Sequence, residues 1–209
     1  MKSTTFIKFL IGILFIATTI TVYSRRAERV YRLEAGKSNF IVHVGTAGLL
    51  SSFGHNHTIK ITKFSGEARV NPDALEQSSL TMNIETGGLQ VIDTDVSDQD
   101  RKDVQSTMQD KVLEVGKFST ASFKSTKVSG IQRNGNDAKL TLEGDLNLHG
   151  VQRHISIPLT VSMNGNELHA KGEIGLKQTD YKIEPVSVGM GSVKVKDEVR
   201  LTFEIVAVQ

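Results

Sequence analysis

Apolar and polar residues alternate through the last third of the chain, and this alternation constrains the fold more than any other feature. From Asp137 onward, apolar residues recur mostly at every second position over four successive runs. Successive residues of a β-strand face opposite sides of a sheet, so each run predicts a strand with one apolar and one polar face. The apolar rows are Leu140, Leu142, Leu146 and Leu148; Ile155, Ile157, Leu159, Val161 and Met163; Leu168, Ala170, Ile174 and Leu176; and Val193, Val195, Val199, Leu201, Phe203 and Ile205.

The amino-terminal half has the same alternation in shorter rows. They are Phe40, Val42 and Val44; Ile59 and Ile61; Leu80, Met82 and Ile84; and a fourth run around Phe123. Short strands separated by Gly and Asn turns, such as residues 164–166 (NGN), are typical of an antiparallel sandwich or barrel.

One helix interrupts the strands. Val104, Met108, Val112 and Val115 recur at helical spacing after Asp and Ser residues that favour a helix start. We therefore predict a helix over roughly residues 97–114. The nearby carboxylates resemble a metal cluster, but acidic residues also stabilise the positive end of a helix, and we interpret them that way. They are Asp93, Asp95, Asp98 and Asp100.

A sheet with one apolar face must cover that face, and a single helix is too little to do so. Closure of the sheet on itself is the simplest solution. We therefore predict an all-β fold, a single antiparallel barrel of about eight strands with one helix, in one domain over residues 30–208. The interior of such a barrel either fills with side chains or holds one small ligand, and composition does not choose between them.

Residues 1–24 are expected to be a targeting segment that precedes the barrel. Lys2 and Lys8 come before an apolar stretch, and small residues follow near Ser24, as in a secretory signal peptide. We favour export with cleavage after Ser24. An uncleaved membrane anchor through residues 9–24 stays open, although about 24 Å of helix is short for a bilayer core of about 30 Å. In both cases the domain is predicted to be periplasmic or extracellular.

Charge and composition exclude several classes of function. Without residues 1–24, basic and acidic residues number 23 each, and this balance gives no reason to expect nucleic-acid binding. The chain has no Cys, which excludes disulfides, thiolate zinc sites and Cys nucleophiles. Sequence motifs of hydrolases, nucleotide-binding enzymes and zinc proteases are absent. We therefore expect a protein that is not an enzyme and has no cofactor.

The strongest candidate for a functional site is a pair of histidines in the stretch 51–61 (SSFGHNHTIKI). In an extended strand His55 and His57 share a face with Ile59 and Ile61, so both imidazoles are predicted to point inward. Three interpretations stay open. The pair is a metal site, although zinc needs three or four ligands; or it holds the polar end of a ligand; or it consists of core histidines bonded to neighbouring polar groups.

Several stretches in order resemble the YceI-like family of lipid-binding, lipocalin-like barrels. They are residues 31–34 (YRLE) with Ser38 and Phe40; 64–66 (FSG); Arg101 and Met108; 123–128 (FKSTKV); 144–151 (GDLNLHGV); and 193–199 (VKVKDEV). The resemblance covers residues 31–207. Where the family usually has Asp-Pro this chain has Glu34 and Ala35, and Ser119 replaces a common Pro after Phe118. The FGHxH loop around Phe53 resembles one branch of the family.

The resemblance implies an extracytoplasmic eight-stranded barrel whose long apolar cavity takes polyisoprenoid or related lipid chains. The uncharged inward rows agree with this, and we predict a protein that carries or sequesters such a chain. The alternative is a metal-binding protein or metal-dependent enzyme centred on His55 and His57. The residues predicted to bind the lipid are Phe40, Val42, Phe53, His55, His57, Leu140, Leu142, Leu146, Ile157, Leu159 and Leu201. The identity of the isoprenoid or acyl lipid, membrane attachment and a homodimer stay open.

Overall fold

The computed structural model describes residues 28–47, 55–188 and 193–209. The predicted signal or anchor over residues 1–24 lies outside these ranges. In the described residues, no helix combines the length and the apolar character that a membrane span needs.

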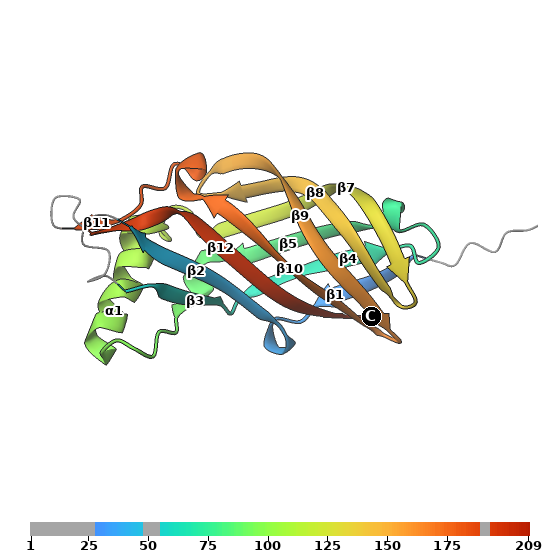
Figure 1. Ribbon diagram of the computed structural model, residues 1–209, viewed down its shortest axis with the longest axis horizontal. Coiled ribbons are helices and arrows are strands. Elements are labelled where there is room, and N and C mark those ends of the chain that lie inside the picture. Colours follow the sequence, from blue (N-terminus) through green and yellow to red (C-terminus); the bar gives the residue numbers. More distant parts are fainter. Residues whose placement is uncertain (1–27, 48–54, 189–192) are drawn as a thin grey trace, which may run out of the picture.

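Strands make up most of the described chain (Figure 1). They are β1 (Arg29–Leu33), β2 (Asn39–Ala47), β3 (His57–Ile61), β4 (Phe64–Val70), β5 (Ser79–Glu85), β6 (Leu89–Val91), β7 (Thr120–Asn134), β8 (Asp137–Leu148), β9 (Val151–Asn164), β10 (Glu167–Lys177), β11 (Ser187–Val188) and β12 (Val193–Val208). The helix α1 (Asp98–Thr107) continues into a π-helical turn, η5 (Met108–Val112). Short 3-10 turns are η1 (Ala35–Lys37), η3 (Leu75–Gln77), η4 (Thr86–Gly88) and η6 (Gln178–Tyr181).

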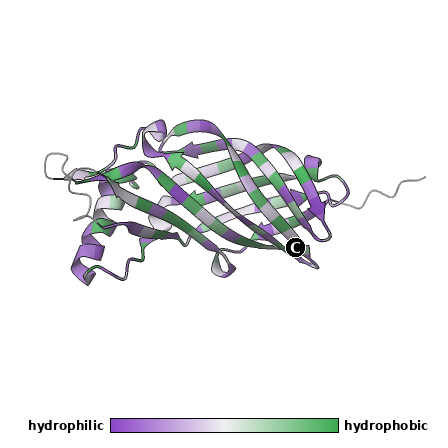
Figure 2. Cartoon of the chain, in the orientation of Figure 1, coloured by the Kyte–Doolittle hydropathy of each residue, from purple (hydrophilic) through white to green (hydrophobic). Residues whose placement is uncertain are grey.

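The strands close into an eight-stranded antiparallel barrel, as predicted. The hydrogen-bonded order around the ring is β1, β4, β5, β7, β8, β9, β10 and β12, and β12 pairs back with β1. Consecutive long strands are joined by short hairpins, including the Gly135 and Gly165 turns, where both glycines have positive φ. Inward and outward residues alternate along each strand, which Figure 2 shows as alternating green and purple bands.

The first three strands of the ring are each broken into two halves, which explains their weaker sequence pattern. β1 and β2 are halves separated by η1, β3 and β4 are separated by two residues, and β5 and β6 are separated by η4. One set of halves, β1, β4 and β5, belongs to the closed ring. The other set, β2, β3 and β6, extends from β12 as a small sheet at one end of the barrel. Each break shifts the alternation, so no single period runs through the whole strand.

Helix α1 covers the free edge of this small sheet. Ser97 caps the helix by accepting a hydrogen bond from the Asp100 amide at 3.0 Å, as the sequence predicts. The Gln105 side chain accepts from the Val91 amide at 2.7 Å and donates to the Leu89 carbonyl at 2.9 Å. It therefore occupies the unpaired edge of β6. The helical segment from Asp98 to Val112 confirms the prediction of a helix over roughly residues 97–114.

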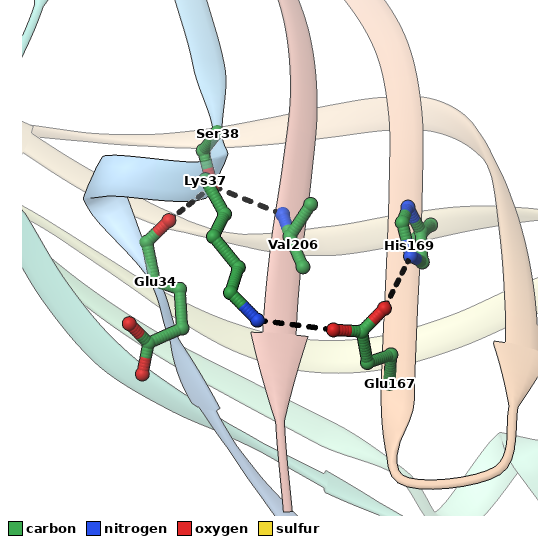
Figure 3. Close-up of polar contacts among 6 residues, drawn as sticks. All are labelled: Glu34, Lys37, Ser38, Glu167, His169 and Val206. Atoms are coloured by element: carbon green, nitrogen blue, oxygen red, sulfur yellow. Dashed lines mark hydrogen bonds and ion pairs between the residues drawn. The ribbon is translucent and has the colours of Figure 1, made fainter.

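The break between β1 and β2 is held by the buried hydroxyl of Ser38 (Figure 3). This hydroxyl accepts a hydrogen bond from the Val206 amide at 3.0 Å and donates to the Glu34 carbonyl at 2.7 Å. The Glu34 amide donates to the Val206 carbonyl at 2.9 Å. Ser38 thus supplies the ladder bond that the 3-10 turn removes, at the point where β12 changes partner from β2 to β1. The nearby ion pair between Lys37 and Glu167 is exposed and contributes little.

We expect Ser38→Ala to lower the free energy of unfolding by about 1–3 kcal/mol, because it leaves the buried Val206 amide without its partner and removes one of the two hydrogen bonds to the Glu34 carbonyl. Urea denaturation followed by circular dichroism measures the change. Ser65→Ala, at an exposed position on β4, is the matched control and should stay within about 0.5 kcal/mol of the wild type. Equal losses in the two variants would contradict this role of Ser38.

Candidate functional site

An apolar cavity lies inside the barrel. Its volume is about 180 Å³, and side chains from all eight strands of the ring line it. At about 15 Å³ for each water-sized group, this volume corresponds to about a dozen such groups. None of the lining residues is charged, and Ser78 and Ser79, at the start of β5, are the polar ones among them. The arrangement suits a hydrocarbon chain, because a polar guest would find almost no hydrogen-bond partner along the walls.

Phe40 and Phe203 line the cavity and pack together with Phe64, a buried ring of the core. Phe40 packs edge-on against both Phe64 and Phe203, with ring centroids 6.1 Å apart in each pair, a favourable arrangement for aromatic side chains. Phe203 lies over Gly172, which faces it on β10. A Cβ atom at Gly172 would come within 2.6 Å of both the Phe203 ring and the Pro158 carbonyl oxygen.

A second glycine supports another ring in the same way. A Cβ atom at Gly144 on β8 would come within 2.6 Å of the Phe123 ring and 2.5 Å of the Lys124 carbonyl oxygen. Both glycines interrupt an apolar row of the sequence. In the structure the space above Gly144 holds the Phe123 ring and the space above Gly172 holds the Phe203 ring. Each ring therefore lies close to the barrel wall, and the centre of the barrel stays open.

Most of the apolar residues predicted to bind a ligand line this cavity. They are Phe40, Leu140, Leu142, Leu146, Ile157, Leu159 and Leu201. Val42 differs: it is not among the lining residues and packs between the main core and the cluster under α1 that contains Ile59, Val91 and Met108. The physical reason is its position along β2: Phe40, at the start of the strand, faces the cavity, whereas Val42 lies two residues further on, where β2 pairs with β3 in the small sheet that faces the helix. Phe53, in the first half of the FGHxH stretch, lies outside the described residues.

The two histidines are not part of the cavity, which corrects the expectation that both point into the barrel. His55 is exposed and precedes β3. His57 faces the α1 side, where its Nδ1 lies 2.7 Å from a carboxylate oxygen of Asp93. Only 2% of the Asp93 side chain is exposed, and its other oxygen accepts the Thr58 amide at 2.6 Å. Asp93 therefore anchors the start of β3 and is not one of the helix-start residues.

Asp93 is the inward carboxylate that sequence reasoning did not find. It lies 36 residues after His57, just beyond β6, which is the neighbour of β3 in the sheet but is distant from it in the sequence, and no spacing rule predicts that pairing. Even with Asp93, no group of three or more potential metal ligands occurs in residues 28–47, 55–188 and 193–209. Of the two, His57 fits the interpretation of a histidine bonded to a neighbouring polar group, with the Asp93 carboxylate as its partner, whereas His55 is exposed and not a core residue.

Sequence reasoning also missed lining residues from outside the regular rows. Leu33, Leu75 and Ser78 belong to a strand end, the η3 turn and the loop after it. No alternation marks these positions. Leu75 is only 2% exposed, and the η3 turn that carries it packs against β7.

Comparison with known proteins places this fold in a family. A family model described as a YceI-like domain matches residues 31–207. The chain belongs to the YceI-like family. This YceI-like protein shares 35% identity with UPF0312 proteins of Vibrio cholerae and 33% with those of Vibrio vulnificus, over 98 residues. The matches cover 47% of this chain and 46% of each relative, so the chain spans about half the length of the curated relatives it matches.

Solved structures share the fold of this YceI-like protein. BcnA from Burkholderia cenocepacia has a TM-score of 0.64 at 20% identity, over 83% of this chain and 98% of that one. A polyisoprenoid-binding domain from Saccharophagus degradans, implicated in plant cell wall breakdown, has a TM-score of 0.61 at 17% identity. The match covers 85% of this chain and 97% of that one. At these identities the likeness shows a common barrel.

We expect Gly172→Ala to lower the free energy of unfolding by about 1–3 kcal/mol, because the added methyl group overlaps the Phe203 ring and a backbone oxygen. Gly36→Ala is the control, since no heavy atom lies within 4 Å of a Cβ at that position. Urea titrations of both variants measure the difference. A Gly172→Ala variant as stable as Gly36→Ala would contradict the close seating of Phe203.

Proposed function

We propose that this protein binds the hydrocarbon chain of a polyisoprenoid or related lipid inside its barrel, outside the cytoplasm, and carries or sequesters it. The observation that carries the proposal is the uncharged cavity lined by all eight strands. Membership of the YceI-like family supports it, as does the polyisoprenoid-binding domain among the structures with the same fold.

Magnitudes favour a long chain over a short one. Burial of a methylene group contributes about 0.8 kcal/mol, so about twelve carbons contribute about 10 kcal/mol. Association costs about 4–15 kcal/mol in lost translational and rotational freedom. A short lipid therefore binds weakly, whereas each further buried carbon adds affinity until the cavity is full.

A bulky side chain placed in the cavity tests this proposal. Ala170 lines the cavity on β10, and the next residue, Lys171, is exposed on the outer face. We expect Ala170→Phe to weaken binding of geranylgeraniol at least tenfold, because the ring occupies the space of several methylene groups. Lys171→Phe is the matched control and should bind as the wild type does. Titration calorimetry measures the affinities, and circular dichroism checks that both variants fold.

Native mass spectrometry of gently purified protein gives a second test of the same proposal. A co-purifying apolar chain that Ala170→Phe excludes and Lys171→Phe retains would support it. Wild-type protein that neither retains a lipid nor binds geranylgeraniol would overturn it.

The location outside the cytoplasm rests on residues 1–24, with their basic start and apolar centre. We expect residues 1–30 fused to alkaline phosphatase to give an active enzyme in a bacterial host, because this reporter folds only after export. The same fusion without residues 9–17 should be inactive. A mass that begins at Arg25 would show cleavage after Ser24, and a full-length, membrane-bound product would favour the anchor. An inactive complete fusion would contradict export.

A further inference from the structure

β9 and β10 separate before they reach the end of the barrel near α1. Their ladder runs from Glu167 paired with Asn164 to Gly172 paired with Leu159, and it stops there. Beyond this point, among the strands of the described chain, β9 pairs only with β8 and β10 only with β12. The separation begins at Pro158, which has no N–H to donate to a ladder. Two neighbouring strands of the ring (Figure 1) are thus left with unpaired edges facing each other.

The turn η6 closes the far end of this gap, so the gap is a window in the barrel wall. Thr179 donates two hydrogen bonds to the Asp197 carboxylate, from its amide at 2.9 Å and from its hydroxyl at 2.7 Å. These bonds hold the pKa of Asp197 below its usual value, so the carboxylate stays charged. The Arg153 Nε donates to the Asp180 carbonyl at 3.0 Å, which ties η6 to β9.

The window adjoins the apolar cavity. Ile155, Ile174 and Leu176 line both the cavity and the window. The outer rim of the window is polar and includes His154, Lys177, Asp180 and Glu198. A chain that fills the cavity can therefore place its polar end at this rim while its apolar part stays among the isoleucines and leucines.

Arg153 is an exposed charged residue that lines the window, at the end of the inward row of β9. Odd-numbered residues of β9 from Ile155 to Met163 line the cavity, and Arg153 continues that row beside its ladder partner Leu146, which also lines it. In the residues that the structure describes, Arg153 donates from Nε to the Asp180 carbonyl, no carboxylate pairs with it, and its Nη atoms have no hydrogen-bond partner. A guanidinium with free Nη donors, at the mouth of an uncharged cavity, suits an anionic oxygen headgroup.

We propose that the window between β9 and β10 holds the headgroup of the bound lipid, and that Arg153 binds that headgroup as a phosphate or carboxylate. This inference rests on the proposed lipid-binding function and assigns the chemistry of the polar end. Asp180 and Glu198 lie on the same rim and disfavour a headgroup of high negative charge. A single phosphate or carboxylate is therefore the class that fits. The polar residues of the cavity itself are Ser78 and Ser79, near the start of β5. Unlike Arg153, they offer an anionic headgroup hydroxyl groups and no positive charge.

Three probes with the same chain and different headgroups test this assignment. They are geranylgeranyl phosphate, geranylgeranoic acid and the neutral alcohol geranylgeraniol. We expect Arg153→Gln to bind the anionic probes about tenfold more weakly than the wild type, because the charge-assisted hydrogen bonds are lost. Its affinity for geranylgeraniol should not change. Arg153→Lys, which keeps the charge, should recover part of the loss.

Arg133→Gln is the matched control, because Arg133 also donates to a backbone carbonyl, that of Pro72, and lies beside the β7–β8 hairpin. It should bind all three probes as the wild type does. A loss confined to the phosphate probe identifies phosphate as the headgroup, and a loss for both anions identifies a general anion site. Unchanged binding of both anions by Arg153→Gln, or an equal loss for the alcohol, would overturn the headgroup site. Failure of the wild type to bind geranylgeraniol would overturn the proposed function instead.

Discussion

Closure of the sheet through β12 is the constraint on which the rest of this structure depends. β12 pairs with β10 along one edge, and along the other it pairs first with β2 and then with β1. The change of partner is possible because the Ser38 hydroxyl bonds to the Val206 amide at the break. Without closure, the inner rows would be exposed to water on an open sheet with two free edges. With closure, the same rows form the wall of a cavity.

The interior is hollow because of where its small and large residues lie. An eight-stranded barrel is just wide enough for side chains to fill it or for one ligand to occupy it. Here Gly144 and Gly172 allow Phe123 and Phe203 to lie close against the wall. Burial also changes along the barrel: Val161 and Leu168 are buried, whereas Ile155 and Ile174, where β9 and β10 separate, are half-buried. The inner surface is therefore less covered near the window, where Arg153 lies.

The ionisable residues near that end of the barrel have separate roles. His57 and Asp93 bond to each other on the side that α1 covers and hold the start of β3 in place. Arg153 lies on β9, where it bonds to η6 and lines the window. In the same region burial raises the pKa of Tyr181, and Asp180 raises it further, so this phenol stays neutral at physiological pH. Charge in the window therefore comes from the groups on its rim.

The long strands β8, β9, β10 and β12 and the helix could be predicted from the sequence, because their periodicity is local and uninterrupted. The inward rows of those strands predicted most of the cavity wall, including Leu140, Ile157 and Leu201. Val42 and His55, which were also predicted to bind the lipid, do not line the cavity. The break at η1 and the start of β3 at His57 change which residues face inward.

The sequence by itself determined which face of each strand is apolar, that the sheet must cover that face, and that the covered side carries almost no charge. Only the tertiary structure decided that the covered space stays open, that Asp93 meets His57, and that β9 and β10 part to leave Arg153 at a window. The physical reason is that alternation is a property of neighbouring residues. Cavity volume, ion pairing and strand separation depend on residues that closure brings together from distant parts of the chain.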